Sequence, residues 1–96
     1  MGFISNAVLL KKAQKEGYAV GAFNANNMEI VQAIIETADE ERAPVILQAS
    51  QGAINYAGVD YITAIVKVAS ENASVPVSLH LDHGTDFNQV IKCIRA

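Results

Sequence analysis

Short apolar runs alternate with longer segments in which apolar residues recur at helical spacing, and this alternation extends along the whole chain. A compact apolar run between turn residues is typical of a buried strand. Three such runs predict three strands, at residues 18–23, 44–48 and 77–81. The segments around them repeat their apolar positions every three or four residues, which is typical of amphipathic helices.

Capping residues indicate where the helices begin and end. Ser5 is placed to cap a first helix that stops at Gly17. Asn26, Asp60 and Asp86 stand before the three later helical segments. Short oxygen-bearing side chains are favoured there because they accept hydrogen bonds from the free N–H groups of a first turn. We therefore expect one helix followed by three strand–helix units.

This order of elements indicates a parallel sheet. Strands separated by helices pair in parallel through crossover connections. An open doubly wound sheet and the first part of a (β/α)₈ barrel both have this order. After the second strand, Ser50-Gln51-Gly52 is expected as a polar turn. The loop after the first strand, residues 23–27, contains no glycine and so lacks the dinucleotide-binding fingerprint.

The third predicted strand favours the barrel. Along it Ser78, His80 and Asp82 alternate with apolar residues. A strand between two helix layers usually reads as continuously apolar, whereas a barrel strand directs alternate residues into the lumen. The expected fold class is α/β: an N-terminal helix and the first three βα units of a (β/α)₈ TIM barrel. Residues 1–96 would then form one partial-barrel domain with its strands in sequential order.

Composition removes several classes of protein. The chain has 96 residues and a formal net charge of −3, and its seven Lys and Arg are scattered, so no nucleic-acid partner is expected. Its apolar stretches fall far short of the ~20 residues of a membrane helix, and its N-terminus lacks a secretory signal. Cys93 is the single cysteine, which excludes a disulfide framework. We expect a cytoplasmic protein with no membrane partner.

Candidate chemistry gathers where the predicted strands end. In both architectures the active site lies at the carboxyl ends of the strands. The polar residues at those ends are Asn24, Asn26 and Asn27, then Gln48, Ser50 and Gln51, then His80, Asp82, His83 and Gly84. We therefore expect all three groups on one rim of the sheet.

The third group leaves two interpretations open. Imidazole is a common zinc ligand and a nearby carboxylate can move protons, so His80, Asp82 and His83 fit a metal site. A catalytic zinc needs three protein ligands, however, and the chain has two histidines in all. A simple hydrogen-bonded cluster fits the same spacing. Likewise, Ser50 fits a plain turn residue and Asp86 a plain helix cap.

Three segments, taken together, resemble a known family. Residues 21–27 (Gly-Ala-Phe-Asn-Ala-Asn-Asn), 43–52 (Ala-Pro-Val-Ile-Leu-Gln-Ala-Ser-Gln-Gly) and 76–84 (Pro-Val-Ser-Leu-His-Leu-Asp-His-Gly) resemble the N-terminal part of class II aldolases. The resemblance extends over essentially the whole chain, in order and with the spacing of the fructose-bisphosphate and tagatose-bisphosphate aldolases. The asparagine-rich first loop is closer to the fructose-bisphosphate branch.

The resemblance implies an aldehyde-lyase of glycolysis and gluconeogenesis with a (β/α)₈ barrel. Such enzymes reversibly cleave fructose 1,6-bisphosphate to dihydroxyacetone phosphate and glyceraldehyde 3-phosphate. A Zn²⁺ cofactor polarises the ketone oxygen of this phosphorylated sugar and stabilises the enediolate. The complete enzyme is expected to be a homo-oligomer.

Site residues carry over by their position in the motifs. The resemblance implies that Asp82 is the catalytic acid/base and His83 one zinc ligand. It places Asn24 and Ser50 near the substrate, with Ser50 close to one phosphate. His80 matches no ligand of the family, and we expect it to pack or to form a hydrogen bond near the site.

Length is where the chain departs from the family. A full barrel needs ~250 residues, and the other zinc ligands and the glycine-rich phosphate loops belong to later strands. The isolated chain is therefore expected to be inactive, with an inactive fragment or an α/β module that docks onto a partner as the alternative. Tagatose 1,6-bisphosphate remains an alternative substrate. A flavodoxin-like binding module would need a phosphate-cradling loop, which the chain lacks.

Overall fold

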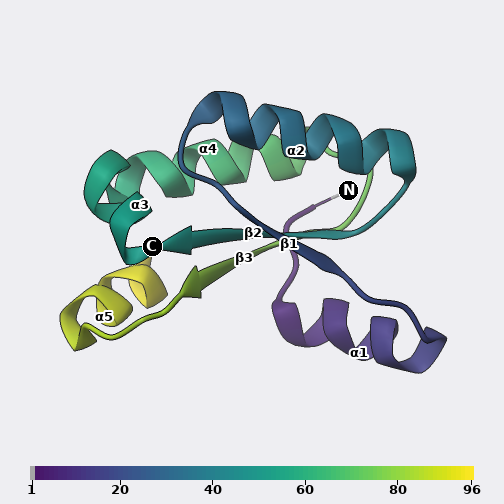
Figure 1. Cartoon of the computed structure of the whole chain (residues 1–96), viewed down its shortest axis with the longest axis horizontal. Helices are drawn as coiled ribbons and strands as arrows, with labels where there is room; N and C mark the ends of the chain where they lie inside the picture. Colours follow the sequence, from purple (N-terminus) through teal and green to yellow (C-terminus); the bar gives the residue numbers. More distant parts are fainter. Residues whose placement is uncertain (1) are drawn as a thin grey trace.

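The computed structural model, which describes residues 2–96, has an α/β fold with a three-stranded sheet (Figure 1). Helices and strands alternate along most of the chain. Their order is α1 (Asn6–Glu16), β1 (Gly21–Asn24), α2 (Met28–Glu41), β2 (Val45–Ser50), α3 (Gln51–Ala57), α4 (Val59–Asn72), β3 (Val77–Asp82) and α5 (Phe87–Arg95).

The strands are parallel and lie in sequential order, β1-β2-β3, as predicted. A doubly wound sheet with β1 between the other two strands is therefore excluded for this part of the chain. The second and third strands begin within one residue of their predicted starts. The first is shorter than predicted, because residues 18–20 approach the sheet without pairing and pairing begins at Gly21.

The apolar core lies between the sheet and the two long helices. Figure 1 shows α2 and α4 together on one side of the sheet and α1 on the other. The core side carries the fully buried Leu47 and Val77 of the strands, which cluster with Val31 of α2 and with Ile62 and Val66 of α4. Burial of these side chains is the main favourable contribution to folding.

Three predicted helix signals are confirmed. Ser5 Oγ accepts a hydrogen bond from Val8 N at 3.3 Å, so Ser5 is the N-cap of α1. Gly17 ends that helix in the left-handed conformation with φ of 76°, which a residue without Cβ adopts at no steric cost. Asp86 caps α5, accepting from the backbone N–H groups of the second and third helical residues.

Two predicted caps are wrong. Asn27, and not Asn26, caps α2, because its Oδ1 lies 2.8 Å from Ile30 N. Asp60 is not the cap of α4, which begins one residue earlier, at Val59, after Gly58. Gly58 has φ of 94°, so the chain turns there through a conformation that favours glycine, and no side chain caps the helix.

The predicted polar turn after β2 is wrong as well, since the seven-residue helix α3 starts there at Gln51. Ser50 Oγ caps it by accepting from Ala53 N at 3.1 Å. Helices this short are marginal in isolation. Burial of Ala53 and Ile54 against the rest of the molecule supports this one.

The polar face of β3 divides into two halves. Ser78, near the start of the strand, is fully buried, and its Oγ lies 2.5 Å from Asn6 Oδ1 of α1. Asn6 Nδ2 also donates to the carbonyl oxygen of Leu79 at 3.3 Å. Helix α1 therefore covers this face near the start of β3, at Ser78. His80 and Asp82, nearer the end of the strand, remain accessible.

The edges of the sheet differ from each other. At the β3 edge, residues 3 and 4 run along the start of the strand, with Ile4 N donating to Val77 O at 2.9 Å. Helix α5 buries none of its residues, although Cys93 is partly buried against the core. Desolvation by this burial raises the pKa of the Cys93 thiol. No helix among the described residues is long and apolar enough to cross a membrane.

The central strand gives a test of the core. Leu47 is 0% exposed, so Leu47→Ala is expected to lower the free energy of unfolding by about 2–5 kcal/mol through lost apolar burial and a cavity. Leu10 is 47% exposed, and Leu10→Ala is the matched control, with an expected change within about 0.5 kcal/mol. Urea unfolding followed by circular dichroism measures both. Equal losses in the two variants would contradict this account of the core.

Candidate active site at the carboxyl ends of the strands

The strand register brings the predicted site residues onto one face of the sheet. Asn24 pairs with Gln48, and Gln48 with His80, in one row across all three strands. Ser50 pairs with Asp82 in the next row of that face, two residues further along. Side chains two residues apart on a strand share a face. The rim predicted from topology is therefore present at the carboxyl ends of the strands.

His80 and Gln48 contact each other across this face. His80 Nδ1 lies 3.2 Å from Gln48 Oε1, a hydrogen-bonding distance. This confirms the expectation that His80 forms a hydrogen bond near the site. If the Gln48 oxygen accepts, the proton is on Nδ1 and Nε2 keeps its lone pair for other partners.

Asp82 and His83 form a compact pair at the end of β3. Asp82 Oδ1 accepts from His83 N at 3.1 Å, and Asp82 Oδ2 lies 3.7 Å from His83 Nε2. The side chain of Asp82 is 31% exposed and that of His83 is 76% exposed. His83 has φ of 69° and Gly84 has φ of 27°, so the chain turns sharply at this point. Adjacent residues that would diverge on a strand therefore reach the same space.

Asn24 is further from the pair than Ser50. Ser50 and Asp82 are direct partners on neighbouring strands, whereas Asn24 lies on β1, two strands from Asp82. Strands are spaced by about 4.8 Å, which separates Asn24 from Asp82 by roughly 10 Å across the sheet. The arrangement has the width of a small ligand, with Ser50 in the middle.

One contact at the rim joins residues that are far apart in the sequence and was not predicted from it. Gln51, the first residue of α3, reaches the loop after β3, where its amide, with the oxygen facing the backbone N–H groups of Thr85 and Asp86, forms hydrogen bonds with both residues. Gln51 itself was placed on the rim by its position after a strand, but its partners lie 34 and 35 residues away and carry no local signal.

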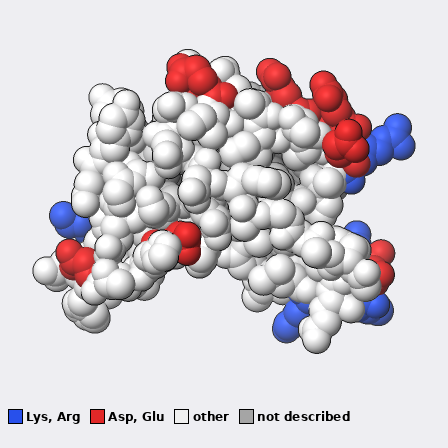
Figure 2. Space-filling model, viewed as in Figure 1, with Lys and Arg blue, Asp and Glu red and all other residues white. Residues whose placement is uncertain are grey.

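Lysine and arginine side chains are absent from the rim segments, which contain two aspartates, Asp82 and Asp86. Figure 2 shows carboxylates gathered over α2 and basic side chains near α1, on opposite sides of the molecule. The rim segments 24–27, 50–52 and 82–86 contain no Lys or Arg. These segments can therefore offer a phosphate group hydrogen-bond donors but no positive side chain.

The donor set does not complete a metal site. Among residues 2–96, no group of three or more His, Cys, Asp or Glu side chains is placed to hold a metal ion. His83 is exposed and can offer one nitrogen. Since a catalytic zinc normally has three protein ligands, the described residues do not fit a complete zinc site by themselves.

Comparison with known proteins agrees with the resemblance. The family described as "Fructose-bisphosphate aldolase class-II" matches residues 5–96. A fructose-bisphosphate aldolase of Thermus caldophilus is 49% identical over 92 residues, covering 96% of this chain and 30% of that protein. A sulfofructosephosphate aldolase of Alkalicoccus urumqiensis is 39% identical over 95 residues, covering 99% of this chain and 33% of that protein.

A solved structure has the same arrangement of elements. The YdjI aldolase of Escherichia coli K12 superposes with a TM-score of 0.86 at 26% sequence identity, over 97% of this chain and 36% of that one. The chain thus spans about a third of the length of the proteins it matches. Since the family match extends over nearly every residue, including all three rim segments, the chain belongs to the class II fructose-bisphosphate aldolase family.

Proposed function

We propose that this chain forms the first three βα units of a (β/α)₈ barrel that reversibly cleaves fructose 1,6-bisphosphate to dihydroxyacetone phosphate and glyceraldehyde 3-phosphate. The observation that carries the proposal is the contact of Asp82 with His83 at the carboxyl end of β3, in register with Ser50. Active sites of such barrels lie at this end of the strands. Family membership supplies the reaction class.

Asp82 moves the proton in this scheme. Its carboxylate is oriented by the His83 N–H group on one oxygen and by the His83 ring beside the other. In the cleavage direction it takes the proton of the substrate hydroxyl that becomes the aldehyde, as the carbon–carbon bond breaks. In the condensation direction it returns that proton to the new alkoxide. Its half-buried position leaves it accessible to a ligand on the lumen side.

Ser50 and Asn24 hold the substrate. Ser50 Oγ accepts from Ala53 N, and an accepting hydroxyl still has its own proton to donate. That proton is available for a phosphate oxygen. Asn24 is exposed at the other side of the rim, where its side-chain amide can both donate and accept. Positive charge for the phosphates comes from outside the rim segments, which contain none.

His83 would contribute one nitrogen to a zinc ion, and the remaining ligands would come from strands outside these residues. A zinc ion bound there supplies Lewis-acid stabilisation of negative charge on a substrate oxygen. The incomplete donor set of residues 2–96 therefore makes the activity a property of the whole barrel. We propose a cytoplasmic, homo-oligomeric enzyme when that barrel is complete.

Fructose 1,6-bisphosphate is the proposed substrate because the fructose-bisphosphate aldolase of Thermus caldophilus is 49% identical to this chain. The sulfofructosephosphate aldolase is 39% identical. Tagatose 1,6-bisphosphate remains the alternative, since the two sugars differ in configuration at a single carbon. A competition assay with both sugars on the complete barrel separates them.

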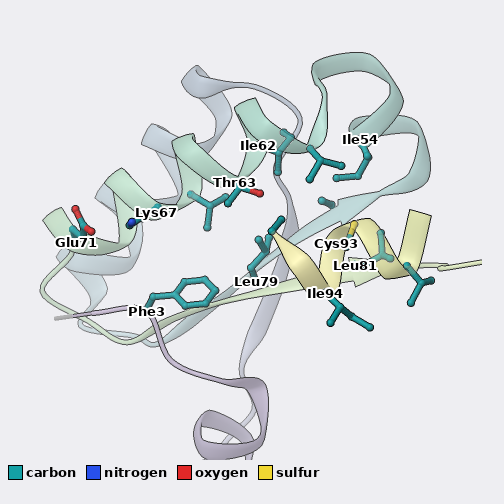
Figure 3. Close-up of a pocket in the computed structure, with 15 residues that line it drawn as sticks. Phe3, Ile54, Ile62, Thr63, Lys67, Glu71, Leu79, Leu81, Cys93 and Ile94 are labelled. Carbon is teal, nitrogen blue, oxygen red and sulfur yellow. The ribbon is translucent and has the colours of Figure 1, made fainter. Parts of the chain in front are cut away.

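A second candidate function is a docking module that joins a polypeptide bearing the other barrel strands. An apolar hollow, with a volume of about 660 Å³, favours this role (Figure 3). Leu79 and Leu81 of β3 line it, and Ile62 of α4 and Ile94 of α5 lie around it. Ile94 is 74% exposed. A further strand beside the carboxyl end of β3 would therefore cover apolar surface of this hollow. The matched proteins are about three times as long as this chain and so contain further polypeptide.

Substitutions of Asp82 and His83 test whether the first moves a proton and the second binds zinc. In a chimera where this chain replaces the matching third of the Thermus caldophilus enzyme, Asp82→Asn is expected to keep zinc and to lower kcat by about 10²–10⁴-fold. His83→Ala is expected to lower zinc content and activity together. Metal analysis and steady-state kinetics measure both effects. Asp60→Asn, an exposed carboxylate on α4, is the control and should change neither.

Equal loss of zinc in the Asp82→Asn and His83→Ala chimeras would contradict this division. So would an Asp82→Asn chimera that retains full turnover. A chimera with no activity before substitution would instead count against the proposed reaction.

The isolated 96-residue chain gives a separate test. It is expected to cleave no fructose 1,6-bisphosphate above a metal-free control and to bind zinc weakly, because it offers one ligand where three are needed. A coupled assay and titration calorimetry measure these properties. Mixing it with the matching C-terminal two-thirds of a relative is expected to restore turnover.

Turnover by the isolated chain, or tight stoichiometric zinc binding by its monomer, would overturn the expectation. Formation of a complex with the C-terminal part that remains inactive would favour the docking module over the enzyme.

A further inference from the structure

The loop that leaves β3 adopts an unusual backbone conformation. His83 has φ of 69°, in the left-handed region, although it is not a glycine. A residue with a Cβ is disfavoured there and remains only where its surroundings hold it. The bond from Asp82 Oδ1 to His83 N is local, and the His83 side chain is 76% exposed. Neither feature anchors the loop to the rest of the molecule.

Gln51 supplies that anchor from another part of the chain. Both atoms of its side-chain amide find partners when the oxygen faces the N–H groups of Thr85 and Asp86, at 2.9 Å each. The amide nitrogen then donates to Thr85 Oγ1, also at 2.9 Å. A side-chain amide has an oxygen that accepts and an NH₂ group that donates. The single Gln51 side chain can therefore bond both to the backbone N–H groups and to the Thr85 hydroxyl of this loop.

The base of this contact is itself well fixed. Gln51 is half-buried at the first position of α3, directly after Ser50, whose hydroxyl caps the helix. Ser50 pairs in register with Asp82. Two contacts therefore link the start of α3 to the end of β3 and its following loop. Ser50 pairs with Asp82 in the sheet, and the Gln51 amide forms hydrogen bonds with Thr85 and Asp86. The position of the loop relative to Ser50 depends on both.

We propose that Gln51 is a positioning residue whose amide holds residues 83–86 and so fixes where His83 and Asp82 point relative to Ser50. It touches neither the substrate nor the reacting atoms and acts through the loop. Its catalytic consequence rests on the proposed function, since it matters only if His83 binds a metal and Asp82 moves a proton. The local geometry can be tested without that assumption.

The test compares two residues of α3 that both reach the region after β3. Gln51→Met keeps the length of the side chain and removes its hydrogen bonds. Asn55→Ala is the matched control, because Asn55 Oδ1 accepts from Gln89 Nε2 of α5 at 3.3 Å without contacting residues 83–86. NMR on the full 96-residue chain supplies two measurements. These are amide hydrogen exchange at Thr85 and Asp86, and the strong intraresidue HN–Hα NOE that marks a positive φ at His83.

Gln51→Met is expected to speed exchange at Thr85 and Asp86 by about tenfold, as the net loss of a hydrogen bond implies. It is also expected to weaken the positive-φ signature of His83. Asn55→Ala should leave both unchanged. Unchanged exchange and NOE in Gln51→Met, or the same change in both variants, would overturn the proposal.

Protection of the Leu47 amide in the central strand shows whether each variant is folded. Gln51→Ser, a shorter and polar replacement, is the second variant in case Gln51→Met unfolds. Unfolding of both would overturn the proposal, because Gln51 would then support the whole fold and not this loop. In the active chimera, Gln51→Met should lower kcat and zinc affinity and leave KM largely unchanged. An inactive parent chimera would count against the proposed function and leave the NMR result intact.

Discussion

The parallel pairing of β2 with β3 is the constraint on which the rest of the structure depends. It runs from Val45 beside Val77 to Ser50 beside Asp82. Because side chains alternate between the two faces of a sheet, a slip of one residue would turn every site residue of β3 toward the core. The apolar partners Leu47 and Leu79 oppose that slip, since a shift of one residue would turn one of them away from the core. The core thereby determines where the chemistry lies.

The two faces of the sheet have different tasks. One is apolar and packs against α2 and α4, which provides stability. The other carries the polar residues of β3 and is divided along its length. Near the start of β3, Asn6 Oδ1 of α1 accepts a hydrogen bond from the Ser78 hydroxyl. Without a partner, this buried hydroxyl would destabilise the fold. His80 and Asp82 at the upper end remain open to a ligand. A polar strand face is thus stable because each of its members has either a partner or access to solvent.

The end of β3 also illustrates how a short turn can place two adjacent residues in the same space. The left-handed conformation of His83 brings its ring beside the Asp82 carboxylate. Such a conformation requires support, and the contact from Gln51 comes from a segment 34 residues away. The start of α3 is therefore linked to the loop after β3 through Gln51, and it lies beside the candidate site.

The sequence by itself determined the order of elements apart from α3, the three strands, the caps Ser5 and Asp86, and the rim on which the candidate residues lie. These features follow from local chemistry: apolar periodicity, and side-chain oxygens next to free N–H groups.

Only the tertiary structure decided the remaining features. Helix α3 has seven residues, too few for a periodic pattern, and it is supported by burial of Ala53 and Ile54. Asn27 and not its neighbour Asn26 is the cap because α2 begins at Met28, which places Ile30 N within reach of Asn27 Oδ1. The contact of Gln51 with Thr85 joins residues that neither periodicity nor spacing relates, because only the paired strands bring them together.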